Sequence, residues 1–337
     1  MMRKYVDKLH NKENLTQSEI EIVMDSIMSG EAMKEDVASF LLALRDKGPT
    51  VEEITGAARI MRKFVIGIRS SHPDLLDTCG TGGDKTNTFN ISTVTALVVA
   101  GAGVPVAKHG NRSVSSKCGS ADILEALGVN LDVEEGRLKD CLDQVGIAFL
   151  FAQKFHPAMK NVAPIRKELG VETIFNILGP LTNPANATHQ MIGVYSRDLV
   201  EPMAQVLKNL GLKKALVVHG SDGLDEITTT GKTFISEYNG NEVMSYDIDP
   251  SELGIIQAKP ADLKGGDLNE NVRIVTSILS GDKGPRRDIV LLNAAYALYI
   301  SDQVSSIEKG MELAKDSIDS KRAQQKLNAL KEFTHAK

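Results

Sequence analysis

The sequence predicts an α/β protein with a small all-α domain and a larger α/β domain around a mostly parallel central sheet. Residues 1 to about 70 carry apolar residues only at helical spacing, which indicates several short helices. From residue 74 onward, short apolar runs alternate with helical stretches, as is typical of a parallel sheet covered by helices. Ligands bind at the carboxyl ends of such strands, so we expect the functional residues there.

The composition excludes several classes of protein. Of the 337 residues, 42% are hydrophobic and 25% charged, so the chain is not intrinsically disordered. A net charge of −5 argues against a protein that coats nucleic acid. No apolar run reaches the ~18 residues of a membrane span, the N-terminus lacks the apolar core of a signal peptide, and three cysteines are too few for a disulfide framework. We expect a reduced, cytoplasmic protein.

Two capping boxes mark helix starts in the N-terminal segment. Thr16 is followed by Glu19 and Thr50 by Glu53, each three residues later and each before an apolar stripe. Gly30 and Gly48 end the first two stripes. The segment has no cluster of chemically active residues, so we interpret it as scaffold or dimer surface.

The remaining elements are expected from apolar runs. We expect strands at 104–107, 147–151, 191–195, 215–218 and 234–238, and helices at 91–102, 123–127 and 288–337. Residues 164–184 are bounded by prolines and resemble two helical pieces joined at Gly170. We predict that they rejoin the N-terminal helices, which gives a helical domain of residues 1–72 and 164–184 and an α/β domain of residues 73–163 and 185–337.

A glycine loop lies at residues 77–84. Gly80, Gly82 and Gly83 allow the main chain to approach a ligand closely, and the helix that opens at 90–93 directs free N–H groups toward an anion. These features indicate a site for phosphate or pyrophosphate. The loop matches neither the Walker A pattern nor Gly-x-Gly-x-x-Gly. A tight strand-to-helix turn is the alternative, and Asp84 suits ribose hydroxyls or a structural role.

A basic loop at 108–122 follows the expected strand at 104–107. Lys108 and Lys117 can neutralise phosphate, Ser115, Ser116 and Ser120 can donate hydrogen bonds to it, and Asn111 suits a second substrate. A solvated basic loop is the alternative.

An acidic turn at 220–226 contains Asp225 and Glu226. Adjacent carboxylates repel each other unless a cation lies between them, and oxygen ligands suit Mg²⁺, with Ser92 as a third candidate ligand. Solvated surface is the alternative. His219 has no second His or Cys at ligand spacing, so we expect only local hydrogen bonds from it.

Taken together, these motifs resemble the anthranilate phosphoribosyltransferase family. The match covers residues 80–84, 90–93, 108–112, 115–116, 119–122, 175–184 and 222–226, in order and spacing. The resemblance implies a nucleoside-phosphorylase-like fold, a homodimer through the helical domain, and no nucleic-acid or membrane partner. It also implies the reaction of anthranilate with 5-phosphoribosyl 1-pyrophosphate, which gives N-(5-phosphoribosyl)anthranilate and pyrophosphate, the second step of tryptophan biosynthesis from chorismate.

The resemblance also implies site residues by position. It implies that Ser92, Asp225 and Glu226 bind two Mg²⁺ ions per monomer. It also implies that anthranilate contacts Gly80, Asn111 and Arg166, with His109, His156 and Pro180 along its path. Catalysis falls to Lys108, Arg166, Asp225 and Glu226. The phosphoribosyl donor falls to Gly80, Gly83, Asp84, Thr88, Asn90, Ile91, Ser92, Thr93, Lys108, His109, Gly110, Asn111, Arg112, Ser113, Val114, Ser115, Ser116 and Ser120.

Glu172 departs from the family pattern, which often has a basic or neutral residue at this position. Its charge would disfavour the approach of anthranilate. Two alternatives to the transferase are a pyrimidine-nucleoside phosphorylase of related fold and a non-catalytic relative that binds nucleic acid. The second should lose the basic run or the acidic pair and carry a basic surface, but here every motif is present and the net charge is −5.

Overall fold

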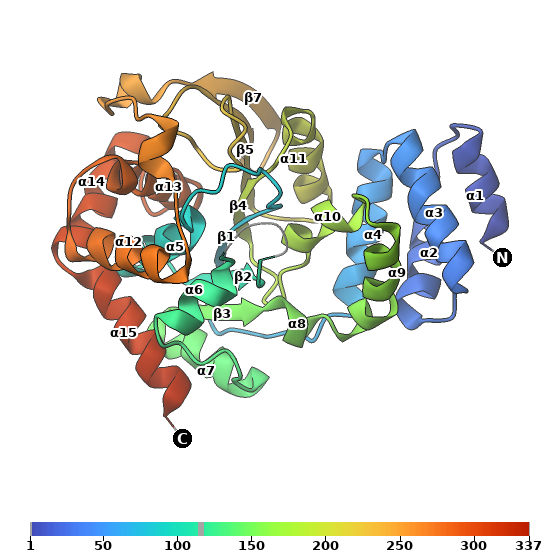
Figure 1. Ribbon diagram of the computed structural model, residues 1–337, viewed down its shortest axis with the longest axis horizontal. Coiled ribbons are helices and arrows are strands. Elements are labelled where there is room, and N and C mark those ends of the chain that lie inside the picture. Colours follow the sequence, from blue (N-terminus) through green and yellow to red (C-terminus); the bar gives the residue numbers. More distant parts are fainter. Residues whose placement is uncertain (1, 114–117, 337) are drawn as a thin grey trace.

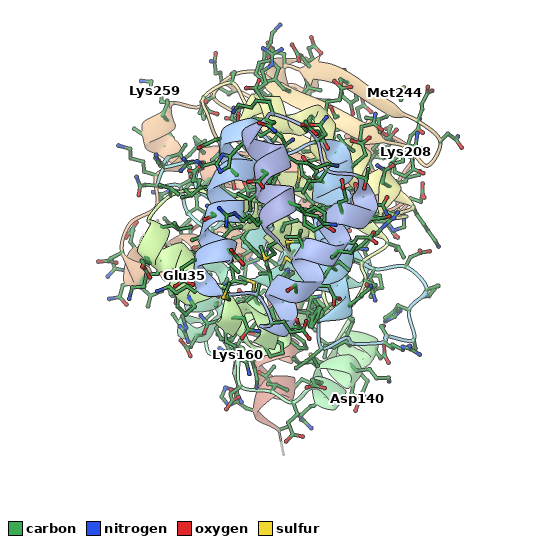
Figure 2. The ribbon with its side chains drawn as sticks, turned by 90° about the vertical axis from the view of Figure 1, so that its right-hand side faces the viewer. Glu35, Asp140, Lys160, Lys208, Met244 and Lys259 are labelled. Carbon is green, nitrogen blue, oxygen red and sulfur yellow. The ribbon has the colours of Figure 1, made fainter. Side chains whose placement is uncertain are left out.

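A helical bundle and an α/β part lie side by side in the computed structural model, which describes residues 2–113 and 118–336 (Figure 1). The bundle contains α1 (Arg3–His10), α2 (Gln17–Ser29), α3 (Lys34–Lys47) and α4 (Val51–Lys63). Both predicted capping boxes are confirmed, because Thr16 and Thr50 accept from the N–H groups of Glu19 and Glu53 and the two carboxylates bond back. Figure 2 looks onto the bundle from its outer side, with Glu35 of α3 at its margin.

A buried ion pair joins three parts of this bundle. The Glu53 carboxylate lies 2.8 Å from Lys47 Nζ, with side-chain exposures of 0% for Glu53 and 4% for Lys47. The same carboxylate accepts from the N–H groups of Leu15 at 2.9 Å and Thr50 at 2.7 Å. Glu53 therefore fixes the start of α4 against the end of α3 and the α1–α2 connection.

The α/β part is built on a seven-stranded sheet with the order β3-β2-β1-β4-β5-β6-β7. The strands from β3 to β5 are parallel, whereas β6 and β7 are antiparallel. The predicted fold class, a small helical domain with a larger, mostly parallel α/β domain, is thus confirmed. The bounds are β1 Leu76–Gly80, β2 Val106–Gly110, β3 Ile147–Phe151, β4 His189–Gly193, β5 Lys214–Gly220, β6 Thr233–Tyr238 and β7 Val243–Ile248.

Several boundaries differ from the sequence prediction. The strand expected at 104–107 is β2, whose pairing with β3 extends to Gly110, so Lys108 and His109 lie in a strand rather than a loop. The first residues of the glycine loop form β1 because they pair with β4. Strand β7 was not expected, since it is a largely exposed edge strand without an apolar run. The expected helix at 288–337 is three helices, α13 (Pro285–Ile300), α14 (Ile307–Asp319) and α15 (Arg322–His335).

Helices cover both faces of the sheet. On one face, α5 (Ile91–Gly101) packs against β1 and β2, and α13 packs against β4 and β5. On the other, α11 (Val200–Asn209) packs against β5, β6 and β7. The other longer helices are α6 (Ser120–Ala126), α7 (Glu135–Val145) and α12 (Leu268–Ser280). No helix among residues 2–113 and 118–336 is long and apolar enough to cross a membrane.

The α11 face of the sheet shares one apolar cluster with the bundle. Val217 of β5, Leu207 of α11 and Ala57 of α4 belong to this cluster, whereas Leu216 and its β5 neighbour Val218 face the opposite core. Helix α4 packs on α11, and Arg59 NH2 donates to the Asn209 carbonyl at 2.9 Å. The two parts of the molecule are therefore joined by a continuous apolar contact.

The segment 164–184 packs on the bundle. It begins in α9 (Ala163–Leu169), breaks at Gly170 with φ 62°, and continues through α10 (Phe175–Leu178) and the 3₁₀ turn Gly179–Thr182. Helix α9 contacts α3, and α10 and the turn contact α4 (Figure 1). The buried side chains of this segment share the apolar cluster of the bundle. The exact division of the chain into two discontinuous domains stays a prediction.

Candidate active site

Four strands end at glycine on the same edge of the sheet: β1 at Gly80, β2 at Gly110, β4 at Gly193 and β5 at Gly220. The acidic turn that follows β5 crosses two of these ends. A Cβ atom on Gly193 would lie 1.5 Å from the Asp225 carbonyl oxygen, and one on Gly80 would lie 2.5 Å from Asp225 Oδ2. The acidic turn can reach the glycine loop only because these strand ends carry no side chains.

Hydrogen bonds connect the predicted motifs at this edge. Asp225 Oδ2 accepts from the Gly82 N–H at 2.9 Å, and Glu226 Oε1 accepts from the Ser92 N–H at 3.0 Å, in the first turn of α5. Lys108 Nζ lies 3.4 Å from Ser92 Oγ and also donates to the Thr78 carbonyl. The structure thus brings together the glycine loop, the start of α5, the basic segment and the acidic pair.

The acidic pair is poorly compensated. Desolvation and the nearby Asp84 raise the pKa of Asp225 to about 7, and desolvation and the charge of Asp225 raise the pKa of Glu226 to about 8. The Lys108 charge opposes the rise at Glu226. These carboxyls would gain from a bound cation, which is the property expected of magnesium ligands.

The described residues do not enclose a metal by themselves. Within residues 2–113 and 118–336, no group of three or more His, Cys, Asp or Glu side chains is placed to hold an ion. Mg²⁺ usually keeps several waters and is bound by one or two carboxylates together with substrate phosphates. An open pair beside a phosphate-type loop fits that pattern.

The glycine loop and the α5 start combine left-handed glycines with polar side chains. Gly82 and Gly83 have φ values of 65° and 83°, in the left-handed region that favours glycine. The Asp84 carboxylate accepts from Thr86 Oγ1 at 2.5 Å, so it shapes the loop, and Thr88 bridges to the main chain of Lys264. At the helix start, Asn90 Oδ1 and the buried Thr93 Oγ1 have no hydrogen-bond partner among residues 2–113 and 118–336. The Ile91 side chain is buried in the core, so only its main chain is available to a ligand.

The basic loop is partly neutralised from within. Arg112 NH1 lies 2.9 Å from Asp122 Oδ1 and 2.8 Å from Glu125 Oε2, so its charge is already paired. Asn111 Oδ1 accepts from the Arg112 N–H at 2.8 Å, and the Asn111 carbonyl accepts from Ser120 Oγ at 3.3 Å. A Cβ atom on Gly110 would lie 2.2 Å from that same hydroxyl oxygen. Ser113 donates its N–H to Asp122. The predicted residues Val114, Ser115, Ser116 and Lys117 lie outside the described residues.

Two histidines meet beside Lys108. His109 Nε2 and His156 Nε2 are 3.1 Å apart. Desolvation lowers the pKa of His109 to about 3 and that of His156 to about 4, so both rings are neutral at pH 7. The expected local role of His219 is confirmed, since its Nδ1 donates to the Val194 carbonyl at 2.8 Å.

Arg166 of α9 is a partly buried cation. It has no carboxylate within 4.0 Å in the described part of the chain, and its charged form is disfavoured because burial lowers its pKa. Its NH2 donates to Asn176 Oδ1 at 3.1 Å, whereas none of the described residues is a hydrogen-bond partner of the buried Nε. A partly buried guanidinium without a carboxylate partner would be stabilised by an anionic ligand. Pro180 is buried, and its carbonyl accepts from Gln190 Nε2 at 2.9 Å.

Known proteins of the same architecture match nearly the whole chain. Residues 3–65 match the glycosyl transferase family helical bundle domain, and residues 72–324 match the glycosyl transferase family a/b domain. Anthranilate phosphoribosyltransferase from Acetivibrio thermocellus is 55% identical over 336 residues, covering 100% of this chain and 97% of that protein. The protein of the same name from Symbiobacterium thermophilum is 52% identical over 99% of this chain and 98% of its own length.

The chain belongs to the anthranilate phosphoribosyltransferase family. The resemblance of its motifs is thereby confirmed.

Solved structures of anthranilate phosphoribosyltransferases agree with this assignment. The enzyme from Thermus thermophilus superposes with a TM-score of 0.93 at 42% identity, covering 98% of this chain and 99% of its own. The Saccharomyces cerevisiae enzyme in complex with PRPP and Mg superposes with a TM-score of 0.90 at 29% identity, covering 99% and 97%. These relatives lend no support to the nucleoside phosphorylase or to the nucleic-acid-binding alternative.

Sequence reasoning missed two residues that shape the site of this anthranilate phosphoribosyltransferase family member. One is Gly193, a lone glycine at a strand end. The other is Asn293, fully buried in α13, which accepts from the Ile227 N–H at 3.0 Å and donates to the Ile227 carbonyl at 2.8 Å. Asn293 thereby fixes the main chain next to Glu226. A single amide within the apolar stretch that follows Asp288 in α13 was the available signal.

Gly193→Ala should abolish most of the family's phosphoribosyl-transfer activity. The new methyl group would collide with the Asp225 carbonyl and displace the acidic turn, and a shift of about 1 Å at a reacting site costs ~100-fold in rate. Steady-state turnover measures the effect. Gly136→Ala in α7 is the matched control, because a Cβ atom there meets nothing within 4 Å. A Gly193→Ala enzyme with wild-type turnover would contradict this account of the strand end.

Proposed function

We propose that the chain transfers the 5-phosphoribosyl group from 5-phosphoribosyl 1-pyrophosphate to the amine of anthranilate and releases pyrophosphate, as the second step of tryptophan biosynthesis from chorismate. One observation carries the proposal. The Gly82 N–H of the glycine loop and the Ser92 N–H at the start of α5 hold the Asp225–Glu226 pair at a single sheet edge, and Lys108 Nζ lies 3.4 Å from Ser92 Oγ at the same edge. This combination of anion donors and cation ligands suits a magnesium-bound diphosphate. The names of the close relatives support the same reaction.

The donor site lies on the α/β part. Gly80, Gly83, Asp84, Thr88, residues 90–93, residues 108–116 and Ser120 would bind the phosphoribosyl donor, in part through main-chain groups. Asp225, Glu226 and Ser92 would hold two Mg²⁺ ions per monomer, and the yeast relative crystallised with PRPP and Mg supports the use of this metal. Bound magnesium would neutralise the negative charge that develops on the departing pyrophosphate. Because Arg112 is ion-paired within the loop, we assign it to loop shape and Lys108 to direct charge compensation.

The acceptor site lies on the bundle side. Arg166 would bind the anthranilate carboxylate, which would also supply the partner that its Nε lacks. Gly80 and Asn111 would contact the acceptor, with His109, His156 and Pro180 along its path. A yeast relative in complex with 4-fluoroanthranilate supports an acceptor of this kind.

The chemistry needs positioning more than proton transfer. The bond between the anomeric carbon and pyrophosphate breaks, a bond to the amine nitrogen forms on the other face of the ribose, and the nitrogen then releases a proton. An aromatic amine is neutral at pH 7 and its lone pair is free, so a strong base is not required. The neutral His109–His156 pair agrees with this, since neither ring carries a charge that would repel a cationic transition state. Lys108 and the aligned N–H groups stabilise the leaving group.

Closure of the two parts would bring donor and acceptor together and exclude water. Glu172 is exposed and lies near Tyr195, because burial of Tyr195 and the negative charge of Glu172 both raise the pKa of Tyr195. We propose that this charge makes the approach of the anthranilate carboxylate less favourable.

We further propose a cytoplasmic homodimer that forms through the bundle. The bundle exposes Ile22 by 47% and Met33 by 66%, and these two side chains would contribute apolar surface to such an interface.

Asp225→Asn and Glu226→Gln should each raise the Mg²⁺ concentration for half-maximal activity at least ~10-fold, the change that a loss of ~1.4 kcal/mol in binding produces. The fall of anthranilate fluorescence measures turnover, which should require anthranilate, the donor and Mg²⁺ together and should stop when EDTA removes the metal. Without metal, both variants should melt at a higher temperature than the wild type, because they relieve buried repulsion. The control is Glu242→Gln on an exposed hairpin. An unchanged Mg²⁺ requirement would remove the pair from the metal site.

Arg166→Ala should raise the KM for anthranilate by ~100-fold, since two charge-assisted hydrogen bonds are worth about 3 kcal/mol. The KM for the phosphoribosyl donor should stay within about twofold, because Arg166 lies on the acceptor side. Lys167→Ala, which changes the exposed neighbouring cation, is the control. Equal increases in both KM values would argue against this assignment.

A further inference from the structure

Asp77 of β1 is a fully buried carboxylate to which the proposed mechanism gives no part. No Lys, Arg or His side chain lies within 4.0 Å of it in the part of the chain that the structure describes. Both of its carboxylate oxygens accept hydrogen bonds from N–H groups of the protein. Oδ1 accepts from the His109 N–H at 3.1 Å, and Oδ2 accepts from Asn183 Nδ2 at 2.8 Å and Gln190 Nε2 at 3.4 Å.

The N–H donors around both oxygens require a side chain that accepts hydrogen bonds and donates none. Among protein side chains, only an ionised carboxylate offers two acceptor oxygens without a donor. Desolvation raises the pKa of Asp77, whereas the Lys108 charge and these donors favour its ionised form. Burial of a charge costs free energy, and an apolar cluster of similar volume would be at least as stable. General stability therefore does not explain why a carboxylate stands here.

The partners of Asp77 reach both sides of the proposed acceptor slot. On the sheet side, Asp77 holds the main chain of His109, whose ring contacts His156. On the bundle side, the same Gln190 Nε2 that donates to Asp77 also donates to the Pro180 carbonyl at 2.9 Å.

Asn183 adds a third connection. Its Nδ2 donates to Asp77 and also, at 2.8 Å, to the carbonyl of Ala107, the residue before Lys108. The end of the 164–184 segment is thereby tied to β1 and β2. The buried Asp77 carboxylate therefore connects His109 on the sheet with Pro180 on the bundle segment and fixes the distance between them.

We infer that Asp77 is a positioning residue that sets the width of the anthranilate slot by holding His109 and, through Gln190, Pro180. The inference rests on the proposed function, because it takes these two residues as the walls of the acceptor path. Pro180 belongs to the proposed acceptor path alone, whereas His109 is shared with the proposed donor site through residues 108–116. Loss of the connection should therefore change recognition of the acceptor ring far more than recognition of the phosphoribosyl donor.

Two variants test the inference. Asp77→Asn keeps the shape but presents an NH₂ group to donors. Gln190→Met removes, at similar volume, the two hydrogen bonds by which Gln190 Nε2 connects Asp77 to the Pro180 carbonyl. Each should raise the KM for anthranilate ~10-fold, as expected when a hydrogen bond worth about 1.4 kcal/mol is lost, with the donor KM within about twofold. Each should also reduce the preference for anthranilate over 4-methylanthranilate, because a wider slot excludes a methyl group less strongly.

Ser236→Ala is the matched control. Ser236 is buried in β6, and its hydroxyl forms a hydrogen bond of 2.6 Å with Ser245 Oγ. It should alter the melting temperature alone. Unchanged acceptor KM and ring selectivity in folded variants, or equal changes in both KM values, would overturn the inference. If Asp77→Asn does not fold, Gln190→Met decides, because it leaves the carboxylate and its other donors in place. Failure of the wild type to consume anthranilate would instead refute the proposed function.

Discussion

The whole site depends on a steric constraint at one edge of the sheet, where the strands end without side chains. The acidic turn comes so close to β4 that its main chain occupies the space of a Cβ atom on Gly193. The Asp225 side chain then reaches the glycine loop across Gly80. Any larger residue at these ends would separate the carboxylates from the amides, and the site would lose its combination of cation ligands and anion donors. The hydrogen bonds between Asn293 and Ile227 hold the main chain next to Glu226 and so maintain this close approach.

Incompletely paired charges are the second common feature of the site. Asp225 and Glu226 repel each other in a poorly solvated turn. Lys108 is buried and Arg166 is partly buried, and neither cation has an ion pair in the described chain. Folding stability alone would favour paired or neutral groups. Substrates and metal would supply partners to both sets, so their binding free energy can compensate for the cost of these unpaired charges. The Lys47–Glu53 pair in the bundle shows the contrasting case, in which the protein itself satisfies a buried charge.

Much of the fold followed from the sequence because its signals are local. The capping boxes at Thr16 and Thr50 and the break at Gly170 depend on a few adjacent residues and were placed correctly. The end of β2 was not placed correctly. Lys108 and His109 belong to this strand because they pair with β3, which lies far away in the sequence. The meeting of Asp225 with Gly82 could be expected only from topology and family resemblance. Asp77 and Gln190 gave no signal, because a buried network is defined by partners far apart in sequence.

The apolar contact between α4 and α11 has a mechanical consequence. Apolar surfaces have no preferred direction of contact, so two packed helices can slide by small amounts without losing a specific bond. Relative motion of bundle and sheet would then proceed as shear along this seam rather than as a wide swing. The exposed hydrogen bond from Arg59 to the Asn209 carbonyl lies at one end of this seam, so it would have to lengthen or break during such a motion.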